Sequence, residues 1–188
     1  MTAKAYSLVI QLAQRNNMPN QFPHEHFDDL LANNVEFAQN FTDQHLTGIA
    51  ARKLAIVTCM DSRISPLEIV GMNPGDVKIL RNAGARVTDD VLRTVMLASF
   101  LLGVERVLVM PHTECKMASA TESQIHNEIL ATYGVDTRSV EIRTVSDQMS
   151  ALKQDVERIR TYPLLAKGVT VAGAIYDVHT GKLNPVDI

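Results

Sequence analysis

Two short groups of residues carry side chains that could bind a metal ion or take part in catalysis. Cys59, Asp61 and Arg63 alternate at the end of one apolar run, and His112 and Cys115 follow another. Thiolate and imidazole groups are the ligands that zinc prefers in proteins. A structural zinc site usually has four such ligands, whereas three protein ligands with an open position are typical of a catalytic zinc ion. The sequence therefore favours one catalytic Zn²⁺ per chain, held by Cys59, His112 and Cys115.

Asp61 and Arg63 are the candidate catalytic residues beside this ion. A guanidinium can hold a carboxylate in a fork of hydrogen bonds, so that Asp61 would orient a zinc-bound water. Zinc lowers the pKa of bound water from about 15.7 towards roughly 7, which makes hydroxide available at neutral pH. Asp61 could instead occupy the fourth coordination position in a closed state. The sequence leaves these two arrangements open.

The order of the predicted elements explains how the two groups would meet. Strands are predicted at 53–58, 76–82, 106–111, 139–145 and 168–178, with an end strand or tail after the turn at 179–182. Helices are predicted at 24–45, 64–71, from the N-cap Thr88 to Gly103, and at 123–134 and 147–162. This alternation predicts an α/β fold with a mostly parallel central sheet of about five strands, flanked by helices. Ligands bind such sheets beyond the carboxyl ends of the strands, where both groups lie.

The chain of 188 residues is long enough for one domain with a sizeable core. We expect a single domain over 1–188, in which 1–45 form a helical N-terminal arm and 53–188 the zinc-binding core. The net charge is −3 and the basic residues are dispersed, which argues against a nucleic-acid partner. No apolar run is long enough to span a membrane. No signal peptide is expected, so the protein is predicted to be cytoplasmic, where thiols stay reduced.

Four motifs together resemble the β-class carbonic anhydrases, most of all their small prokaryotic branch. They are CMDSR at 59–63, RNAG at 81–84, VTDD at 87–90 and HTEC at 112–115. The resemblance runs from about Lys53 to the C-terminus. It implies a zinc lyase that reversibly hydrates CO₂ to bicarbonate by zinc-bound hydroxide. It also implies an active site in a dimer cleft, and so a homodimer or a dimer of dimers that uses the N-terminal arm.

By residue type and place, the resemblance makes Cys59, His112 and Cys115 the zinc ligands, and Asp61 and Arg63 the catalytic pair. Five further residues are expected to shape the site: Ser62, Asn82, Ala83, Gly84 and Lys116.

Two of these site-shaping residues raise specific expectations. Gly84 is expected to supply a turn. Lys116 stands where the family usually has glycine after the last ligand. Either the backbone is ordinary helix there, or the loop is rebuilt, and the ammonium group could attract an anion or narrow the cleft.

Other interpretations remain open. The same scaffold serves zinc hydrolases of carbonyl sulfide and carbon disulfide, and a catalytically silent zinc- or anion-binding relative is a further alternative. The two cysteines could also be packed core residues or have a redox role. His126 is interpreted as a surface residue of a helix rather than a proton shuttle, and His179 as a solvated turn residue.

Overall fold

The computed structural model of the chain describes residues 22–188. They fall into two compact units, one ending at His45 and the other comprising Leu46–Ile188. The boundary lies close to the predicted junction between arm and core. The part of the predicted arm before residue 22 lies outside the described residues. None of the helices described is long and apolar enough to cross a membrane.

The described part of the arm is helical, as predicted, but the helix is shorter than the range 24–45. It consists of a 3₁₀ turn at His24–His26, the helix α2 at Asp28–Gln39 and a second 3₁₀ turn at Asp43–His45. No side chain of α2 is buried. Its exposed apolar residues are Leu30, Leu31, Val35 and Phe37.

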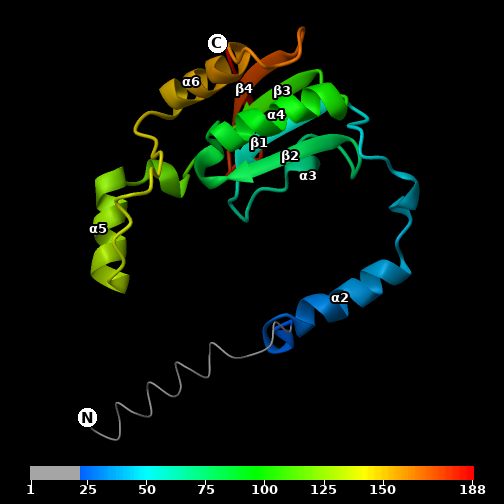
Figure 1. The fold of residues 1–188 in the computed structure, drawn as a ribbon, viewed down its shortest axis with the longest axis horizontal. Coiled ribbons are helices and arrows are strands. Elements are labelled where there is room, and N and C mark those ends of the chain that lie inside the picture. The colour runs from blue at the N-terminus through cyan, green and yellow to red at the C-terminus, as the bar shows by residue number, and fades with distance from the viewer. Residues whose placement is uncertain (1–21) are drawn as a thin grey trace, which may run out of the picture. The chain divides into compact units, whose positions relative to one another are not determined.

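The second unit is built on one five-stranded sheet, in the order β2-β1-β3-β4-β5 (Figure 1). The strands are β1 (Leu54–Cys59), β2 (Val77–Asn82), β3 (Arg106–Met110), β4 (Thr170–Tyr176) and β5 (Leu183–Val186). The first four are parallel, and β5 runs antiparallel to β4. Every residue of β1 is buried, since this strand lies between β2 and β3 and is covered on both faces. The predicted α/β fold is confirmed.

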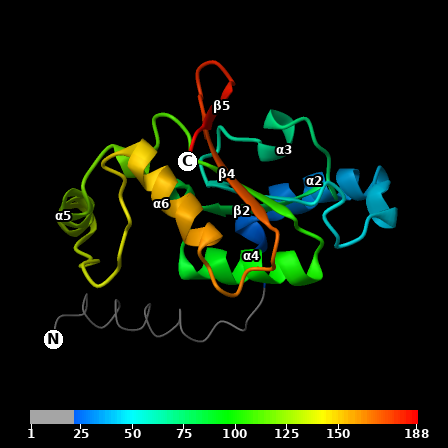
Figure 2. The same cartoon turned by 90° about the horizontal axis from the view of Figure 1, so that it is seen from above.

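The helices of this unit are α3 (Pro66–Ile69), α4 (Asp89–Leu101), α5 (Glu122–Tyr133) and α6 (Gln148–Arg160). Helices α4 and α6 pack their apolar residues with Ala55, Val57 and Val107 of the sheet in one core cluster. Figure 2 shows these two helices and the strand β4 from above. Thr88 caps α4 as predicted, because its side chain accepts a hydrogen bond from the backbone N–H of Val91.

The predicted strand at 139–145 is wrong, and the fifth strand is β5, at the end of the chain. The alternating apolar residues of this segment are typical of a strand, but its N–H groups have other partners. The carboxylate of Glu122 accepts hydrogen bonds from the backbone N–H groups of Ile142 (3.0 Å) and Arg143 (3.3 Å). Arg143 also has a φ of 59°, which is left-handed and incompatible with a strand. The edge of β4 is instead paired by β5, which a tight turn brings alongside it.

A buried ion pair joins α6 to the turn after β2, and we predict that removing one of its partners strongly destabilises the fold. Asp155 accepts a hydrogen bond from Nε of Arg86 (2.6 Å) and one from the backbone N–H of Val87 (3.2 Å). Both charged side chains are largely buried. Asp155→Ala should lower the free energy of unfolding by about 3 kcal/mol, because it leaves a buried guanidinium unpaired. Urea unfolding measures this.

The exposed pair between Asp89 and Arg158 provides the control. Asp89→Asn should lower the free energy of unfolding by less than about 1 kcal/mol. Equal losses of unfolding free energy in Asp155→Ala and Asp89→Asn would show that the buried pair matters no more to stability than an exposed one.

Candidate metal centre

Cys59, His112 and Cys115 meet at one edge of the sheet. Cys59 is the last residue of β1, and the other two lie in the loop after the neighbouring parallel strand β3. Their ligand atoms all lie within 4.8 Å of one another, and the two Sγ atoms are 3.9 Å apart. All three side chains are buried. Two sulfurs and one nitrogen at such spacing form a donor set that suits zinc.

The state of His112 adds an independent argument for a metal ion. Its Nδ1 donates a hydrogen bond to the carbonyl oxygen of Thr113 (2.8 Å), which can only accept. In the neutral ring, Nε2 then carries a lone pair. Within residues 22–188, His112 Nε2 is the one buried side-chain nitrogen or oxygen that has no hydrogen-bond partner. Because an unpaired buried polar atom is unfavourable, this nitrogen is well suited to a cation between the two thiols.

The surroundings of the two sulfurs include backbone donors. The N–H of Gly84 donates to Cys59 Sγ (3.4 Å). Burial raises the pKa of the Cys115 thiol, and a hydrogen bond from the backbone of Met117 opposes this rise. A bound cation would also oppose this rise, since metal binding releases the thiol proton.

Asp61 lies beside His112 and is held by Arg63. Asp61 Oδ1 accepts hydrogen bonds from Nε (3.0 Å) and the backbone N–H (2.9 Å) of Arg63, and Oδ2 accepts one from Nη2 (2.8 Å). Asp61 Oδ2 is 3.7 Å from His112 Nε2. The hydrogen bonds between Asp61 and Arg63 hold the pKa of the Asp61 carboxyl well below its usual range. The same bonds raise the pKa of the Arg63 guanidinium. Asp61 is therefore an ionised hydrogen-bond acceptor at the edge of the ligand group.

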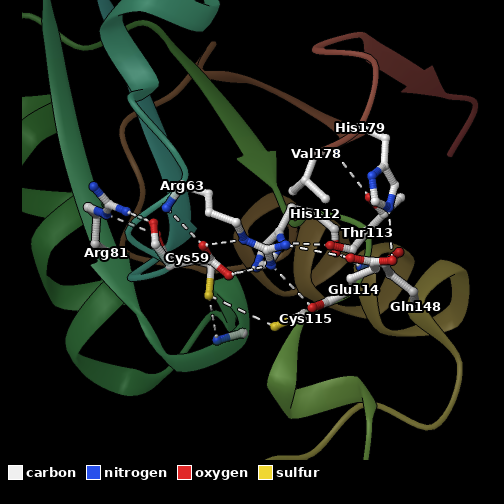
Figure 3. Close-up of polar contacts among 12 residues, drawn as sticks. Cys59, Arg63, Arg81, His112, Thr113, Glu114, Cys115, Gln148, Val178 and His179 are labelled. Atoms are coloured by element: carbon white, nitrogen blue, oxygen red, sulfur yellow. Dashed lines mark hydrogen bonds and ion pairs between the residues drawn. The ribbon is translucent and has the colours of Figure 1, made fainter.

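Two residues that received no role from the sequence support this loop through backbone carbonyls. Arg81 donates to the carbonyl oxygens of Cys59 (2.9 Å) and Asp61 (2.6 Å), and Gln148 Nε2 donates to that of His112 (Figure 3). The place of Arg81 at the end of the second predicted strand is a sequence signal that it lies at the same edge of the sheet as the ligands. For Gln148, in the first turn of α6, the sequence contains no comparable signal.

The residues predicted to shape the site lie in two places, next to Asp61 or Cys115 in the chain and in the turn after β2. Asn82 bridges the turn after β2, since its side chain contacts both the carbonyl (2.6 Å) and the N–H (2.9 Å) of Arg86. Ala83 and Gly84 lie within that turn, where Gly84 has a left-handed φ of 79°. Ser62 is exposed between Asp61 and Arg63.

Lys116 lies on backbone without the left-handed φ that glycine allows, in a short 3₁₀ turn rather than an ordinary α-helix. It begins the 3₁₀ turn Lys116–Ala118 and is not among the residues with positive φ. The left-handed residue of this loop is Glu114, with a φ of 55°. Glycine is therefore not needed at position 116 for conformational reasons.

The two histidines outside the ligand group differ in burial. His126 is buried, so its interpretation as a surface residue is wrong. Its Nδ1 lies 2.8 Å from the hydroxyl of Thr137, and its Nε2 lies 3.6 Å from Glu122. His179 is exposed, and its Nε2 is 2.8 Å from Glu114 Oε1.

Gly84 allows a prediction about the metal centre. A Cβ at this position would lie 3.2 Å from Cβ of Met117, on backbone with a left-handed φ. We expect Gly84→Ala to displace the N–H that faces Cys59 and to weaken zinc binding by about 10-fold, as loss of other hydrogen bonds to ligands does. Competition with a zinc chelator measures this affinity. Gly134→Ala is the control, since Gly134 has a similar φ of 69° but nothing within 4 Å of the added Cβ. Equal zinc affinity in both variants would contradict the prediction.

Comparisons with known proteins agree with this geometry. A family model described as carbonic anhydrase matches residues 54–183. A β-carbonic anhydrase 1 from Mycobacterium tuberculosis is 36% identical over 160 residues, which cover 85% of this chain and 96% of that protein. A carbon disulfide hydrolase from Acidithiobacillus thiooxidans is 31% identical over 154 residues, covering 71% of this chain and 77% of that protein.

Solved structures give the same result. A crystal structure of a carbonic anhydrase from Streptococcus mutans matches with a TM-score of 0.81 and 31% identity. The match covers 89% of this chain and 99% of that one. With the family model, the relatives and this structure in agreement, the chain belongs to the β-class carbonic anhydrase family.

Proposed function

We propose that the protein is a zinc-dependent carbonic anhydrase that interconverts CO₂ and bicarbonate. The observation that carries this proposal is the buried group of Cys59, His112 and Cys115, with the unpartnered Nε2 of His112 beside an ionised Asp61. Membership of the family supports the same activity.

In this proposal Cys59, His112 and Cys115 hold one Zn²⁺ per chain. When bound, zinc lowers the pKa of a coordinated water and so supplies a nucleophile near neutral pH. Asp61 has the role of orienting the attacking water. As an ionised carboxylate it can only accept a hydrogen bond, which turns the lone pair of the water oxygen towards the carbon of CO₂.

Arg63 favours this orienting role of Asp61 over a role as fourth zinc ligand. Both carboxylate oxygens accept hydrogen bonds from the guanidinium, and Oδ1 accepts another from the backbone. Oδ1 thus uses both of its lone pairs and Oδ2 uses one, so that a single lone pair of Oδ2 is left for a hydrogen bond from the attacking water. Ser62, Asn82, Ala83, Gly84 and Lys116 complete the proposed site as residues that shape its backbone and its entrance.

Stopped-flow measurement of CO₂ hydration on zinc-replete protein tests the proposal. We expect roughly one zinc ion per chain and a rate that rises towards alkaline pH. A protein with this zinc content that hydrates no CO₂ at neutral or mildly alkaline pH would contradict the proposal, and would be a catalytically silent relative if it also hydrolyses neither CS₂ nor COS.

A hydrolase of carbon disulfide or carbonyl sulfide is the second candidate. It is supported by the similarity to the A. thiooxidans protein. CS₂ and COS are linear and carbon-centred, as CO₂ is, so the same nucleophile can attack all three. Rates measured with the three substrates on one preparation decide between the activities.

We further propose that the chain functions as one domain over 1–188, in a cytoplasmic homodimer or dimer of dimers. The exposed apolar residues of α2 support association, because a helix with no buried side chain has apolar surface left to cover. Reduced thiols as ligands suit the cytoplasm. Light scattering coupled to size-exclusion chromatography measures the oligomer size.

A further inference from the structure

Arg63 lies between two carboxylates, of which only Asp61 belongs to its own motif, CMDSR at 59–63. Its Nε and Nη2 donate to Asp61, while its Nη1 lies 3.5 Å from Oε2 of Glu114. Its Nη2 also donates to the backbone carbonyl of Glu114 (3.4 Å). Glu114 therefore contacts the guanidinium at Nη1 and Nη2, whereas Asp61 contacts it at Nε and Nη2. Figure 3 shows Glu114 beside Arg63.

Glu114 reaches Arg63 from an uncommon backbone conformation. Its φ of 55° is left-handed, which L residues other than glycine adopt only at a cost in free energy. Such conformations gather at functional sites. Here the residue lies between two of the proposed zinc ligands, His112 and Cys115, and both its carbonyl and its carboxylate face Arg63.

His179 holds the other oxygen of Glu114. Its Nε2 is 2.8 Å from Glu114 Oε1, and the hydrogen bond to Glu114 raises the pKa of His179. The turn that carries His179 is itself fixed. The backbone N–H of His179 donates to Asp177 (2.8 Å), and that of Val178 donates to the hydroxyl of Thr113 (3.1 Å). The turn between β4 and β5 is thus tied to the loop that carries the ligands.

We propose that Glu114 and His179 are positioning residues that hold Arg63, and through it Asp61, in place for the reaction. This inference rests on the proposed function. The guanidinium would be confined on two sides, by Asp61 and by Glu114, and His179 would fix Glu114. Neither Glu114 nor His179 needs to touch the substrate.

A second Asp-x-Arg fork in the same chain provides an internal comparison. Arg138 donates to Asp136 through Nε (2.9 Å), Nη2 (2.6 Å) and the backbone N–H (3.1 Å), as Arg63 does to Asp61. In the part of the chain that the structure describes, Arg138 has no ion pair with a second carboxylate. The additional contact of Arg63 with Glu114 is therefore not a general consequence of the motif.

The test compares Glu114→Gln with the unaltered protein by two readouts. The first is the exchange of the arginine Nε–H protons with water, measured by ¹⁵N NMR, in which Arg138 serves as internal reference. The second is CO₂ hydration, with the zinc content measured on the same samples. We expect faster exchange at Arg63 but not at Arg138, unchanged zinc, and kcat lowered about two- to five-fold, the range of an exposed ion pair. KM should not change, since only the orientation of the nucleophile is affected.

His179 is tested by two substitutions. His179→Ala should lower kcat, as Glu114→Gln does. His179→Gln should keep most of the original kcat, because the glutamine amide can still donate a hydrogen bond to Glu114. Glu141→Gln breaks another Glu–Arg pair, with Arg143, and is the control that should leave kcat unchanged.

The possible outcomes separate the inference from the proposed function. Unchanged exchange at Arg63, unchanged kcat, or loss of zinc in Glu114→Gln would each overturn the positioning role. In the last case Glu114 would act on the ligand loop instead. If the unaltered protein hydrates no CO₂, the proposed function fails. The NMR comparison then still shows whether Glu114 holds Arg63.

Discussion

Cys115→Ser should remove zinc from the protein and abolish CO₂ hydration. The substitution changes one buried atom, replacing a soft thiolate by a hydroxyl that binds zinc poorly. Loss of hydrogen bonds to zinc ligands already weakens zinc binding by 10- to 100-fold in other proteins, so loss of a ligand should weaken it by more than about 100-fold. Zinc per chain is measured by mass spectrometry after dialysis, and hydration by stopped flow.

Thr58→Val is the matched control for this variant. Thr58 is also buried, precedes Cys59 in β1, and donates a hydrogen bond from its hydroxyl to the carbonyl of Met110 (2.7 Å). The valine variant should lose about 1 kcal/mol of stability but keep its zinc. Full zinc occupancy in Cys115→Ser would remove Cys115 from the ligand set. Loss of zinc in Thr58→Val would mean that destabilising this edge of the sheet is enough to release zinc, even when all three ligands are present.

The fold was predictable where local sequence and burial agree. The continuous apolar run of β1 and the cap at Thr88 predict their elements because a buried parallel strand and a helix start have strong local signals. The error at 139–145 has a long-range cause. The backbone N–H groups of Ile142 and Arg143 donate to the side chain of Glu122, at the start of α5. No local sequence pattern reveals this contact. The buried His126 lies beside the same carboxylate, with its Nε2 3.6 Å from Glu122.

For the candidate site, ligand type and strand position were sufficient to bring Cys59, His112 and Cys115 together. Parallel strands next to each other end at the same edge, so a residue at a strand end has few possible locations. Strand position places Arg81 at this edge too, but its carbonyl partners and the contacts of Glu114 were not predictable in this way. They depend on where backbone carbonyls and a left-handed residue lie, which are properties of the folded loop.

Asp61→Asn should leave zinc binding intact and lower kcat by about 100-fold or more, because misplacing a reacting group by about 1 Å can cost about that factor in rate. The shape of the side chain is kept, so the ligands are undisturbed. The amide, however, can accept at only one of its two terminal atoms. Its NH₂ group would either face the donors of Arg63 or donate to the attacking water, which turns the lone pair away from the carbon.

Asp136→Asn gives this experiment a control of the same chemistry. Asp136 makes the same three hydrogen bonds with an arginine two residues later, but in the connection between α5 and α6. Breaking that exposed fork should have little effect on stability and leave kcat unchanged. If both variants lose activity equally, the effect lies in folding rather than in the reaction. If Asp61→Asn keeps full turnover with zinc bound, Asp61 does not orient the nucleophile, and Arg63 loses its proposed role with it.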